Sequence, residues 1–346
     1  RMVGGGTHGH WRNDDRLVAG VGAGFAPNRM IGKGRGYVLP ALFLSRKMNN
    51  TFLSTRLTAG ARVTPVENGW RLSIPPGAAG AYRWAQLDDY MELPRKAFRH
   101  AAPLVLSLRA RVSAQGLPGT WGFGLWNDPF SMGLGVGGAR RRLPALPQTA
   151  WFFHASEDNY LSLRDDLPAN GMLMGVFQAA RLPVWSLLPA APLLAGLALP
   201  PLARRLRRAA RWLVKAEAAR LELDFTAWHE YRLEWRAEGV RFAVDGETRF
   251  ETRLSPRGRM GLVLWLDNQF AAFRPDGQVR FGTQANPVEA WLEITDVEWR
   301  KPHPRACGAT LPRWNQGRVK KSPFQFQFAA GLRGGEMHIC CVALIQ

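Results

Sequence analysis

The clearest pattern in the chain lies between Trp228 and Gly246, where hydrophobic and polar residues alternate in two consecutive runs. In the first run every second residue is hydrophobic: Tyr231, Leu233 and Trp235. Such period-two alternation is typical of β-strands with one buried and one solvent-facing side. Gly239 separates the runs, and we expect it to supply the positive φ of a tight connection, while Asp245-Gly246 marks the next turn. The segment predicts an antiparallel hairpin.

The same alternation predicts further strands along the chain, within residues 70–74, 82–90, 104–112, 119–126, 149–156, 260–269 and 290–299. The segment 119–126 is unusual because its two faces differ in size. One face carries large side chains: Trp121, Phe123 and Leu125. The other face carries Gly122 and Gly124 beside Trp126. A bare glycine face lets something large approach the backbone, either a ligand or aromatic side chains of the protein itself.

Residues 179–222 do not follow a β pattern and predict an insertion. The uncharged stretch Leu182–Ala203 is long enough to cross a membrane, but five prolines argue against a continuous spanning helix. From Leu202 onward the spacing becomes helical. The apolar side of this helix is expected to hold Leu202, Leu206, Ala209, Leu213 and Ala216. The opposite side is expected to hold Arg204, Arg207, Arg208, Arg211 and Lys215.

Two interpretations of this insertion remain open. In the first, it is a lid whose apolar side packs on the rim of the domain. In the second, it lies on an anionic membrane surface. The lid is favoured because the segment falls between two predicted strands, so both of its ends are fixed to the domain.

Charge distribution separates the domain from its flanks. The net charge of the chain is +19, of which residues 1–46, 179–222 and 302–346 carry +5, +6 and +5. Only +3 remains for the rest of residues 47–301, so a general phosphate-binding face is not expected and nucleic acid is not a predicted partner. The glycine-rich residues 1–46 and the irregular residues 302–346 are expected to be tails around one domain.

The sequence gives little indication of a metal site, a bound cofactor or disulfide bonds. The three cysteines, at positions 307, 340 and 341, all lie in the C-terminal tail, so no disulfide framework is expected in the body. Two glycine-rich runs, 20–24 and 32–36, neither follow a strand nor open a helix as phosphate loops do. His8 and His10 have no third ligand nearby in sequence. No secretory signal is visible, and we predict no cofactor and no metal site.

The hairpin sequence also resembles a known family. The pattern Trp228-His229-x-Tyr231, then Leu233-Glu234-Trp235, a Gly turn, and Val244-Asp245-Gly246 is similar to the family 16 glycoside hydrolases of the concanavalin A-like lectin/glucanase superfamily. The resemblance extends over residues 51–300 and is specific at 228–246. It implies an all-β fold, a two-sheet antiparallel jelly-roll sandwich whose concave sheet holds sugar chains, here with one proline-rich and helical insertion.

The resemblance also implies a catalytic strand, and this sequence departs from it there. In the family, Glu, Asp and Glu at alternate positions project into the cleft. The corresponding strand here reads Trp-Phe-Phe-His-Ala-Ser over residues 151–156, without acids. We therefore predict no catalytic residues. The leading interpretation is a non-catalytic or divergent relative that binds a carbohydrate. A hydrolase with a rearranged carboxylate pair, among Asp128, Glu157, Asp158 and Asp267, is the alternative, and membrane-surface binding through 179–222 is the third.

Candidate ligand-binding residues come from the strands that the resemblance assigns to the cleft. Aromatic rings can stack on sugar rings, and carboxylate or amide groups can hydrogen-bond to hydroxyls. His154 is a further candidate, with a histidine satisfied inside an aromatic core as the competing interpretation. The full set of candidates is Trp121, Trp126, Asp128, Phe153, His154, Trp265, Asp267 and Asn268.

Overall fold

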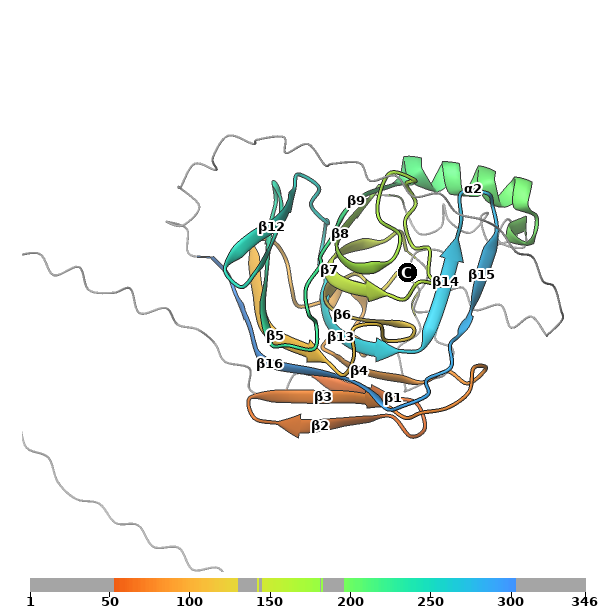
Figure 1. Ribbon diagram of the computed structural model, residues 1–346. Coiled ribbons are helices and arrows are strands. Elements are labelled where there is room, and N and C mark those ends of the chain that lie inside the picture. The colour runs from red at the N-terminus through yellow and green to blue at the C-terminus, as the bar shows by residue number, and fades with distance from the viewer. Residues whose placement is uncertain (1–52, 130–141, 143–144, 181, 183–195, 303–346) are drawn as a thin grey trace, which may run out of the picture. The chain divides into compact units, whose positions relative to one another are not determined.

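The computed structural model describes residues 53–129, 142, 145–180, 182 and 196–302 (Figure 1). Apart from Pro302, the two predicted tails lie outside this part of the chain. The described residues form two large antiparallel β-sheets that pack face to face, with one α-helix between two strands of the second sheet. The predicted fold, an all-β two-sheet sandwich of jelly-roll type with a helical insertion, is confirmed.

Sheet 1 has seven strands in the order β12 (Glu247–Thr252), β11 (Gly239–Val244), β10 (His229–Arg236), β5 (Leu104–Val112), β16 (Ala290–Arg300), β3 (Gly69–Ile74) and β2 (Arg62–Val66). Sheet 2 has seven strands in the order β1 (Ser54–Leu57), β4 (Trp84–Asp88), β13 (Gly261–Asp267), β6 (Thr120–Trp126), β7 (Gln148–Ala155), β8 (Gly171–Ala179) and β9 (Val214–Arg220). A separate hairpin pairs β14 (Gln269–Phe273) with β15 (Val279–Thr283), and short 3₁₀ turns span Arg95–Ala97 (η2) and Gly196–Ala198 (η4).

The main core lies between the two sheets and follows the alternation read from the sequence. Tyr231 and Phe242 on sheet 1 meet Phe123 and Phe152 on sheet 2, with ring centroids 5.0–5.1 Å apart. All four side chains are at most 1% exposed. Burying an aromatic or large aliphatic side chain contributes roughly 1.5–3 kcal/mol. The two inner faces therefore supply the main hydrophobic stabilisation of the sandwich.

A second hydrophobic cluster covers the opposite, outer face of sheet 2. It joins strand residues such as Trp151 and Trp265 to Leu161 of the β7–β8 connection and Ala271 of the β14–β15 hairpin. The isolated bridge between Tyr160 and Ala272 ties this connection to the hairpin. The outer face of sheet 2 is thus largely covered by the protein's own segments, whereas the outer face of sheet 1 carries charged side chains.

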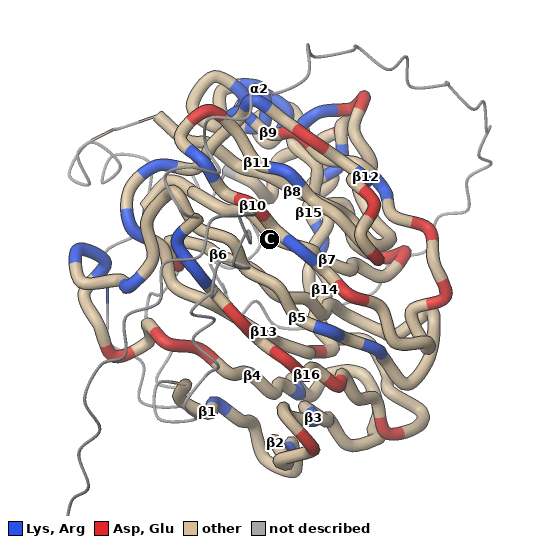
Figure 2. The backbone as a smooth tube through the Cα atoms, turned by 90° about the vertical axis from the view of Figure 1, so that its left-hand side faces the viewer, with Lys and Arg blue, Asp and Glu red and all other residues tan. Residues whose placement is uncertain are grey.

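On sheet 1, charges of both signs are interspersed along the strands, while α2 is dominated by arginine (Figure 2). Glu293 lies between Arg71 and Arg111, at 2.6 and 2.7 Å. Burial alone would raise the pKa of Glu293, but hydrogen bonds from the two arginines bring this pKa below its ordinary value. The strand charges largely neutralise one another, as the small net charge of the body indicates.

The insertion lies between adjacent strands β8 and β9 of one sheet, as predicted, but two details of the prediction were wrong. Residues 214–220 form strand β9 and do not extend the helix, which ends at Leu213. Alternating burial of Val214 and Ala216 against β8 overrides the helical spacing of the local sequence. The helix α2 (Pro200–Leu213) docks through Ala203 and Arg207, not through its leucines.

Arg207 is the residue that attaches α2 to the domain. Its guanidinium, 2% exposed, donates to the backbone carbonyls of Ser162 and Phe273 at 2.6 and 2.8 Å and forms an ion pair with Asp165 at 2.7 Å. Arg211 donates to the same carboxylate at 2.6 Å. Because its partners lie on two other segments, the basic side of the helix faces inward here. Leu213 is 36% and Trp212 88% exposed.

Within the described residues, no helix has the length and apolar character needed to cross a membrane.

The predicted hairpin 228–246 forms as β10 and β11, but the role assigned to Gly239 was wrong. Gly239 is not among the positive-φ glycines; it pairs with Arg236, and a Cβ there would lie 2.2 Å from the Thr252 carbonyl oxygen. The positive φ values occur instead at Asp245 and Gly246, at 51° and 81°, in the turn to β12. Gly239 is needed because the β12 backbone approaches closely.

Two alanine substitutions separate these two reasons for glycine. Gly239→Ala should lower the free energy of unfolding by about 2–3 kcal/mol, since backbone must move to admit the methyl group. Gly246→Ala has open space within 4 Å and should lose only about 1 kcal/mol, from its left-handed conformation. Urea denaturation of both variants checks this order; a larger loss for Gly246→Ala would contradict it.

Removing the Arg207 guanidinium should release α2. Arg207→Met keeps the aliphatic part of the side chain but leaves two carbonyls without their donor and Asp165 with Arg211 alone, so unfolding free energy should fall by about 2–4 kcal/mol. Amide hydrogen exchange in α2 should accelerate with it. The matched control is Arg205→Met on the exposed side of the same helix, expected to change stability by less than about 0.5 kcal/mol. Equal effects in both would rule out the anchoring role.

Candidate ligand-binding site

Five aromatic side chains form a continuous surface on the outer face of sheet 2, called here the aromatic face: Trp126, Trp151, Phe153, Phe177 and Trp265. Trp151 is at its centre. Its ring centroid lies 5.1 Å from that of Phe153, 5.4 Å from that of Trp265 and 5.9 Å from that of Trp126. Trp151 and Phe153 are stacked at an interplanar angle of 17°. Two of the outward-pointing positions of β7, 151 and 153, are therefore aromatic.

The glycines of β6 make this arrangement sterically feasible. A Cβ at Gly122 would lie 2.8 Å from the Trp265 ring, and one at Gly124 would lie 2.5 Å from Cβ of Trp151. Register places Gly122 opposite Trp265 and Gly124 opposite Trp151. The sequence left open whether a ligand or the protein's own aromatics approach this bare face. The indoles of Trp151 and Trp265 are the occupants.

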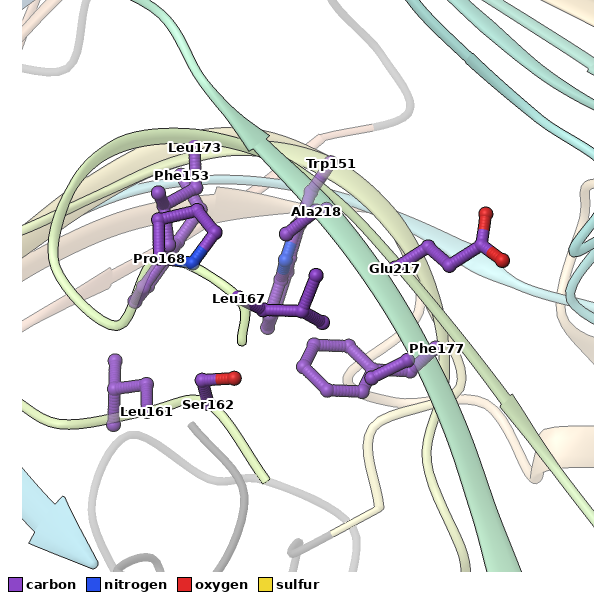
Figure 3. A pocket seen from close by; sticks show the side chains of 12 residues that line it. Trp151, Phe153, Leu161, Ser162, Leu167, Pro168, Leu173, Phe177, Glu217 and Ala218 are labelled. Atoms are coloured by element: carbon purple, nitrogen blue, oxygen red, sulfur yellow. The ribbon is translucent and has the colours of Figure 1, made fainter. Parts of the chain in front are cut away.

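A pocket opens at one end of the aromatic face, where β7, β8 and β9 meet the connection between β7 and β8 (Figure 3). It is a small hollow: about 30 Å³ is accessible to the centre of a water-sized sphere. The lining comprises Trp151, Phe153, Leu161, Ser162, Leu167, Pro168, Leu173, Gly175, Phe177, Ala216, Glu217 and Ala218. Leu167 and Phe177 lie beside the Trp151 indole, whereas the carboxylate of Glu217 points away from the pocket (Figure 3). The walls are predominantly apolar.

The α2 helix holds the β7–β8 connection, which forms one side of this pocket. The Arg207 bond to the Ser162 carbonyl fixes a pocket residue to the helix, and the ion pairs to Asp165 hold the same connection. Ser162 also uses its hydroxyl internally, donating to the Arg164 carbonyl at 2.7 Å. The pocket rim is thus held in place by hydrogen bonds that do not involve the pocket interior.

Three of the predicted residues, Trp126, Phe153 and Trp265, lie together on the aromatic face. Phe153 lines the pocket, Trp126 is half-buried at the rim, and Trp265 is 4% exposed with its indole nitrogen donating to the Thr120 hydroxyl at 3.0 Å. Of the three, only Trp126 is more than a few per cent exposed, and Phe153 is 2% exposed although it lines the pocket.

Trp121 and His154 lie on the inner face of sheet 2, on the other side from the aromatic face. They are register partners, and their rings stack at 5.4 Å. Both are buried, at 1% and 6% exposure, and burial lowers the pKa of His154 to about 4, so the ring is neutral at pH 7. Strand alternation puts them one position away from Gly122 and Phe153, which turns their side chains toward sheet 1.

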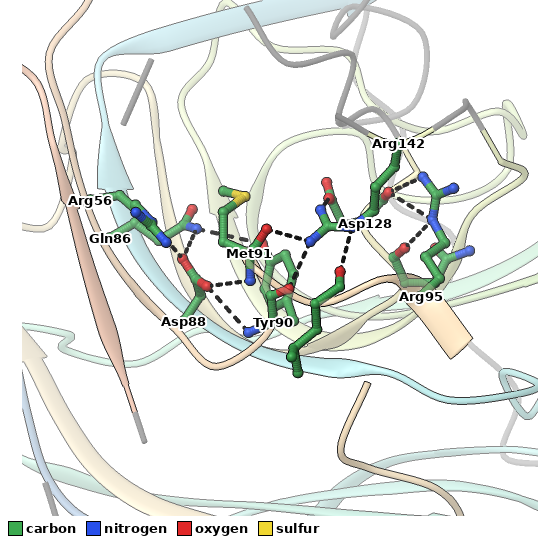
Figure 4. A network of polar contacts seen from close by, with 10 residues as sticks. Arg56, Gln86, Asp88, Tyr90, Met91, Arg95, Asp128 and Arg142 are labelled. Atoms are coloured by element: carbon green, nitrogen blue, oxygen red, sulfur yellow. Dashed lines mark hydrogen bonds and ion pairs between the residues drawn. The ribbon is translucent and has the colours of Figure 1, made fainter. Parts of the chain in front are cut away.

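Asp128 belongs to a buried polar network at the edge of the aromatic face (Figure 4). Its carboxylate pairs with the Arg142 guanidinium, which also donates to the carbonyls of Tyr90 and Met91 at 2.7 and 2.5 Å. Arg95 donates to the neighbouring Asn127 carbonyl at 2.8 Å. Asp128 is 4% exposed and has a φ of 47°. The network fixes the backbone around the end of β6.

Asp267 and Asn268 are also buried and hydrogen-bonded within the protein. One oxygen of Asp267 accepts from the Thr120 hydroxyl, the Thr120 amide and the Gln269 amide at 2.9, 3.2 and 3.0 Å. Burial raises the pKa of Asp267 to about 7 despite these bonds. Asn268, fully buried, accepts from the Arg83 amide and donates to the carbonyls of Ala81 and Gln284. Both residues connect β13 to neighbouring loops.

The outward-facing carboxylates of β4 and β13 are too far apart for glycoside hydrolysis. Asp88 is opposite Val263, and Asp267 is four residues further along β13. At about 3.4 Å per residue the backbone positions of Asp88 and Asp267 are about 14 Å apart along the strands. Retaining enzymes need about 5 Å and inverting enzymes about 6.5–9.5 Å. Asp88 was not in the predicted set. Of the predicted acids besides Asp267, Asp128 pairs with Arg142, Asp158 accepts from Gln284, and Glu157 is exposed just after the end of β7.

Of the pocket lining, the sequence identified only Phe153; the residues that it missed include Trp151, Phe177 and Leu167. Trp151 had a usable signal, because it precedes Phe153 by two positions on a predicted strand and must share its face. Phe177 belongs to β8, which was not predicted, and Leu167 lies in a connection without periodicity. Among the described residues, no group of three or more His, Cys, Asp or Glu could hold a metal ion.

The raised pKa of the buried Asp267 predicts how the free energy of unfolding changes with pH. Its pKa is about 7 in the folded protein against 3.8 for an ordinary Asp, so between these values the unfolded chain releases a proton that the folded chain keeps. Unfolding free energy should therefore fall as pH rises from about 4 to 7, by at most roughly 1.4 kcal/mol per pH unit. Asp267→Asn retains the accepting oxygen and removes this dependence.

The measurement is the difference in unfolding free energy between Asp267→Asn and the unchanged protein at pH 4, 5, 6 and 7. That difference should move in favour of the variant by a few kcal/mol across the series. Comparing two proteins is necessary because neutral His154, whose pKa is lowered, contributes the opposite slope between about pH 4 and 6.5. Its contribution cancels in the difference. A pH-independent difference would contradict a neutral Asp267.

Comparisons with known proteins return structural similarity only. No protein-family model matches the chain, and no curated protein matches its sequence. Among solved structures, a family 16 endo-glucanase from Bacteroides ovatus is 8% identical over 73% of this chain and 96% of its own, with a TM-score of 0.40. The β-glucanase of Bacillus licheniformis is 10% identical over 73% of this chain and 94% of its own, with a TM-score of 0.39.

A legume lectin-like domain from Entamoeba histolytica is 8% identical over 72% of this chain and 90% of its own, with a TM-score of 0.37. The architecture of this chain, established above from its own strand order, agrees with the concanavalin A-like, family 16-like fold that the hairpin sequence resembles.

Proposed function

We propose that this protein is a carbohydrate-binding protein without glycosidase activity, which holds a sugar against the open end of the aromatic face. The observation that carries the proposal is the identity of the outward positions of β7. Trp151, Phe153 and Ala155 stand there, on a strand whose counterpart in the resembling family carries the catalytic acids. Aromatic rings at these positions favour stacking on the C–H face of a sugar over cleavage of its bond.

We place the sugar ring at the mouth of the pocket beside Trp151. Phe177 and Trp126 are the half-buried members of the aromatic face, one lining the pocket and the other at the rim. A ring bound there covers apolar surface and leaves most of its hydroxyls toward the solvent. The absence of glycosidase activity is supported by the separation of Asp88 from Asp267 and by the Asp128–Arg142 pair.

Binding is tested first on an array of immobilised glycans and then by calorimetric titration with the best oligosaccharide. Phe177→Ala should weaken binding at least tenfold, because it removes one wall of the pocket. Trp212→Ala is the matched control, since Trp212 is 88% exposed on α2 and is not part of the pocket lining. It should bind within about twofold of the unchanged protein.

The proposal fails if no glycan binds, or if Phe177→Ala and Trp212→Ala bind alike. Release of reducing sugar from any bound glycan would overturn the non-catalytic part alone.

A further inference from the structure

The pocket offers one unused hydrogen-bond donor among apolar walls. The indole N–H of Trp151 has no hydrogen-bond partner in the described part of the chain, and the position that a Cβ of Gly175 would take is 3.3 Å from this nitrogen. Of the other buried indole nitrogens, those of Trp265 and Trp235 donate to Thr120 and Ser255, whereas those of Trp121 and Trp126 also have no partner among the described residues but do not line the pocket. An indole nitrogen is a donor only. A ligand that places a hydrogen-bond acceptor at the Trp151 N–H is therefore favoured.

The remaining polar groups of the lining are already engaged. The Ser162 hydroxyl is bonded to the backbone of Arg164, and Glu217 turns away to accept from the Thr252 hydroxyl. The pocket wall around Trp151 is built from aliphatic and aromatic side chains, with Leu167, Pro168 and Phe177 among them. A sugar hydroxyl buried here would bring a donor that finds no acceptor, which is unfavourable.

We propose that the pocket takes the N-acetyl group of an N-acetylated sugar. The acetyl carbonyl accepts the Trp151 N–H, and the methyl group lies against Leu167 and Phe177, which border the indole in Figure 3. The amide N–H and the sugar hydroxyls stay at the open side of the pocket. This inference rests on the proposed function and narrows it to sugars carrying an acetamido substituent.

Gly175 has a specific part in this arrangement. It faces outward on β8, opposite Trp151 in the register, and its missing side chain leaves the indole nitrogen accessible. A methyl group 3.3 Å from that nitrogen would occupy the approach of the ligand carbonyl. Trp151 and Gly175 together form a small site in the pocket where a ligand acceptor can receive a hydrogen bond.

The test compares three β-1,4-linked tetrasaccharides by calorimetric titration: N-acetylglucosamine, glucosamine and glucose. With the unchanged protein, the N-acetylated tetramer should bind at least tenfold more tightly than both others. Trp151→Phe keeps an aromatic ring and removes the N–H, so the ratio of the dissociation constants for the glucose and N-acetylglucosamine tetramers should fall to about twofold within this variant, whatever its overall affinity. Gly175→Ala should reduce the same preference through steric exclusion. Trp212→Phe, away from the pocket, should keep it.

The outcomes separate the two proposals. Equal binding of all three tetramers by the unchanged protein would overturn the N-acetyl inference and leave the carbohydrate proposal standing. An undiminished preference in both Trp151→Phe and Gly175→Ala would also overturn it. If no tetramer binds and the glycan array is negative, the proposed function itself fails. The ligand series on the unchanged protein remains decisive even if Trp151→Phe does not fold.

Discussion

Two indoles pack onto the outward face of strand β6 at its two glycines. The outer half of this structure depends on this interaction. Trp151 and Trp265 lie on the backbone of β6 because Gly122 and Gly124 leave no Cβ in their way. A two-sheet sandwich needs only the layer between its sheets to be hydrophobic. Here the outer face of sheet 2 is hydrophobic as well, so it requires a cover.

Arginine side chains hold in place the segments that cover this face. Arg207 brings α2 onto the β7–β8 connection and the β14 end by two backbone carbonyls and one carboxylate. Arg142 joins the end of β6 to the backbone at Tyr90 and Met91. A guanidinium has five donors in a fixed geometry, which suits a position where several carbonyls from different segments converge. Part of the basic charge of the insertion is thus structural.

Replacing acids by aromatics changes what the outer face of sheet 2 can do. Carboxylates at alternating positions of one strand would give this face negative charge, whereas Trp151 and Phe153 give it ring surface. Two carboxylates of sheet 2, those of Asp88 and Asp267, are buried and have raised pKa values. They act as capping groups for neighbouring backbone amides. The proposed role, binding without hydrolysis, rests on this arrangement.

The amino-acid sequence by itself determined the fold class, the hairpin of β10 and β11 and the faces of β6, because strand alternation is a local property. It also located the insertion between two strands. It could not decide which aromatic face is covered, which carboxylates are consumed by partners, or that Arg207 points inward. Each of those outcomes depends on groups brought together from distant positions: Arg207 meets Phe273, Asp128 meets Arg142, and Trp151 meets Trp265. Only tertiary packing creates these pairs, and the pocket beside Trp151 exists because of them.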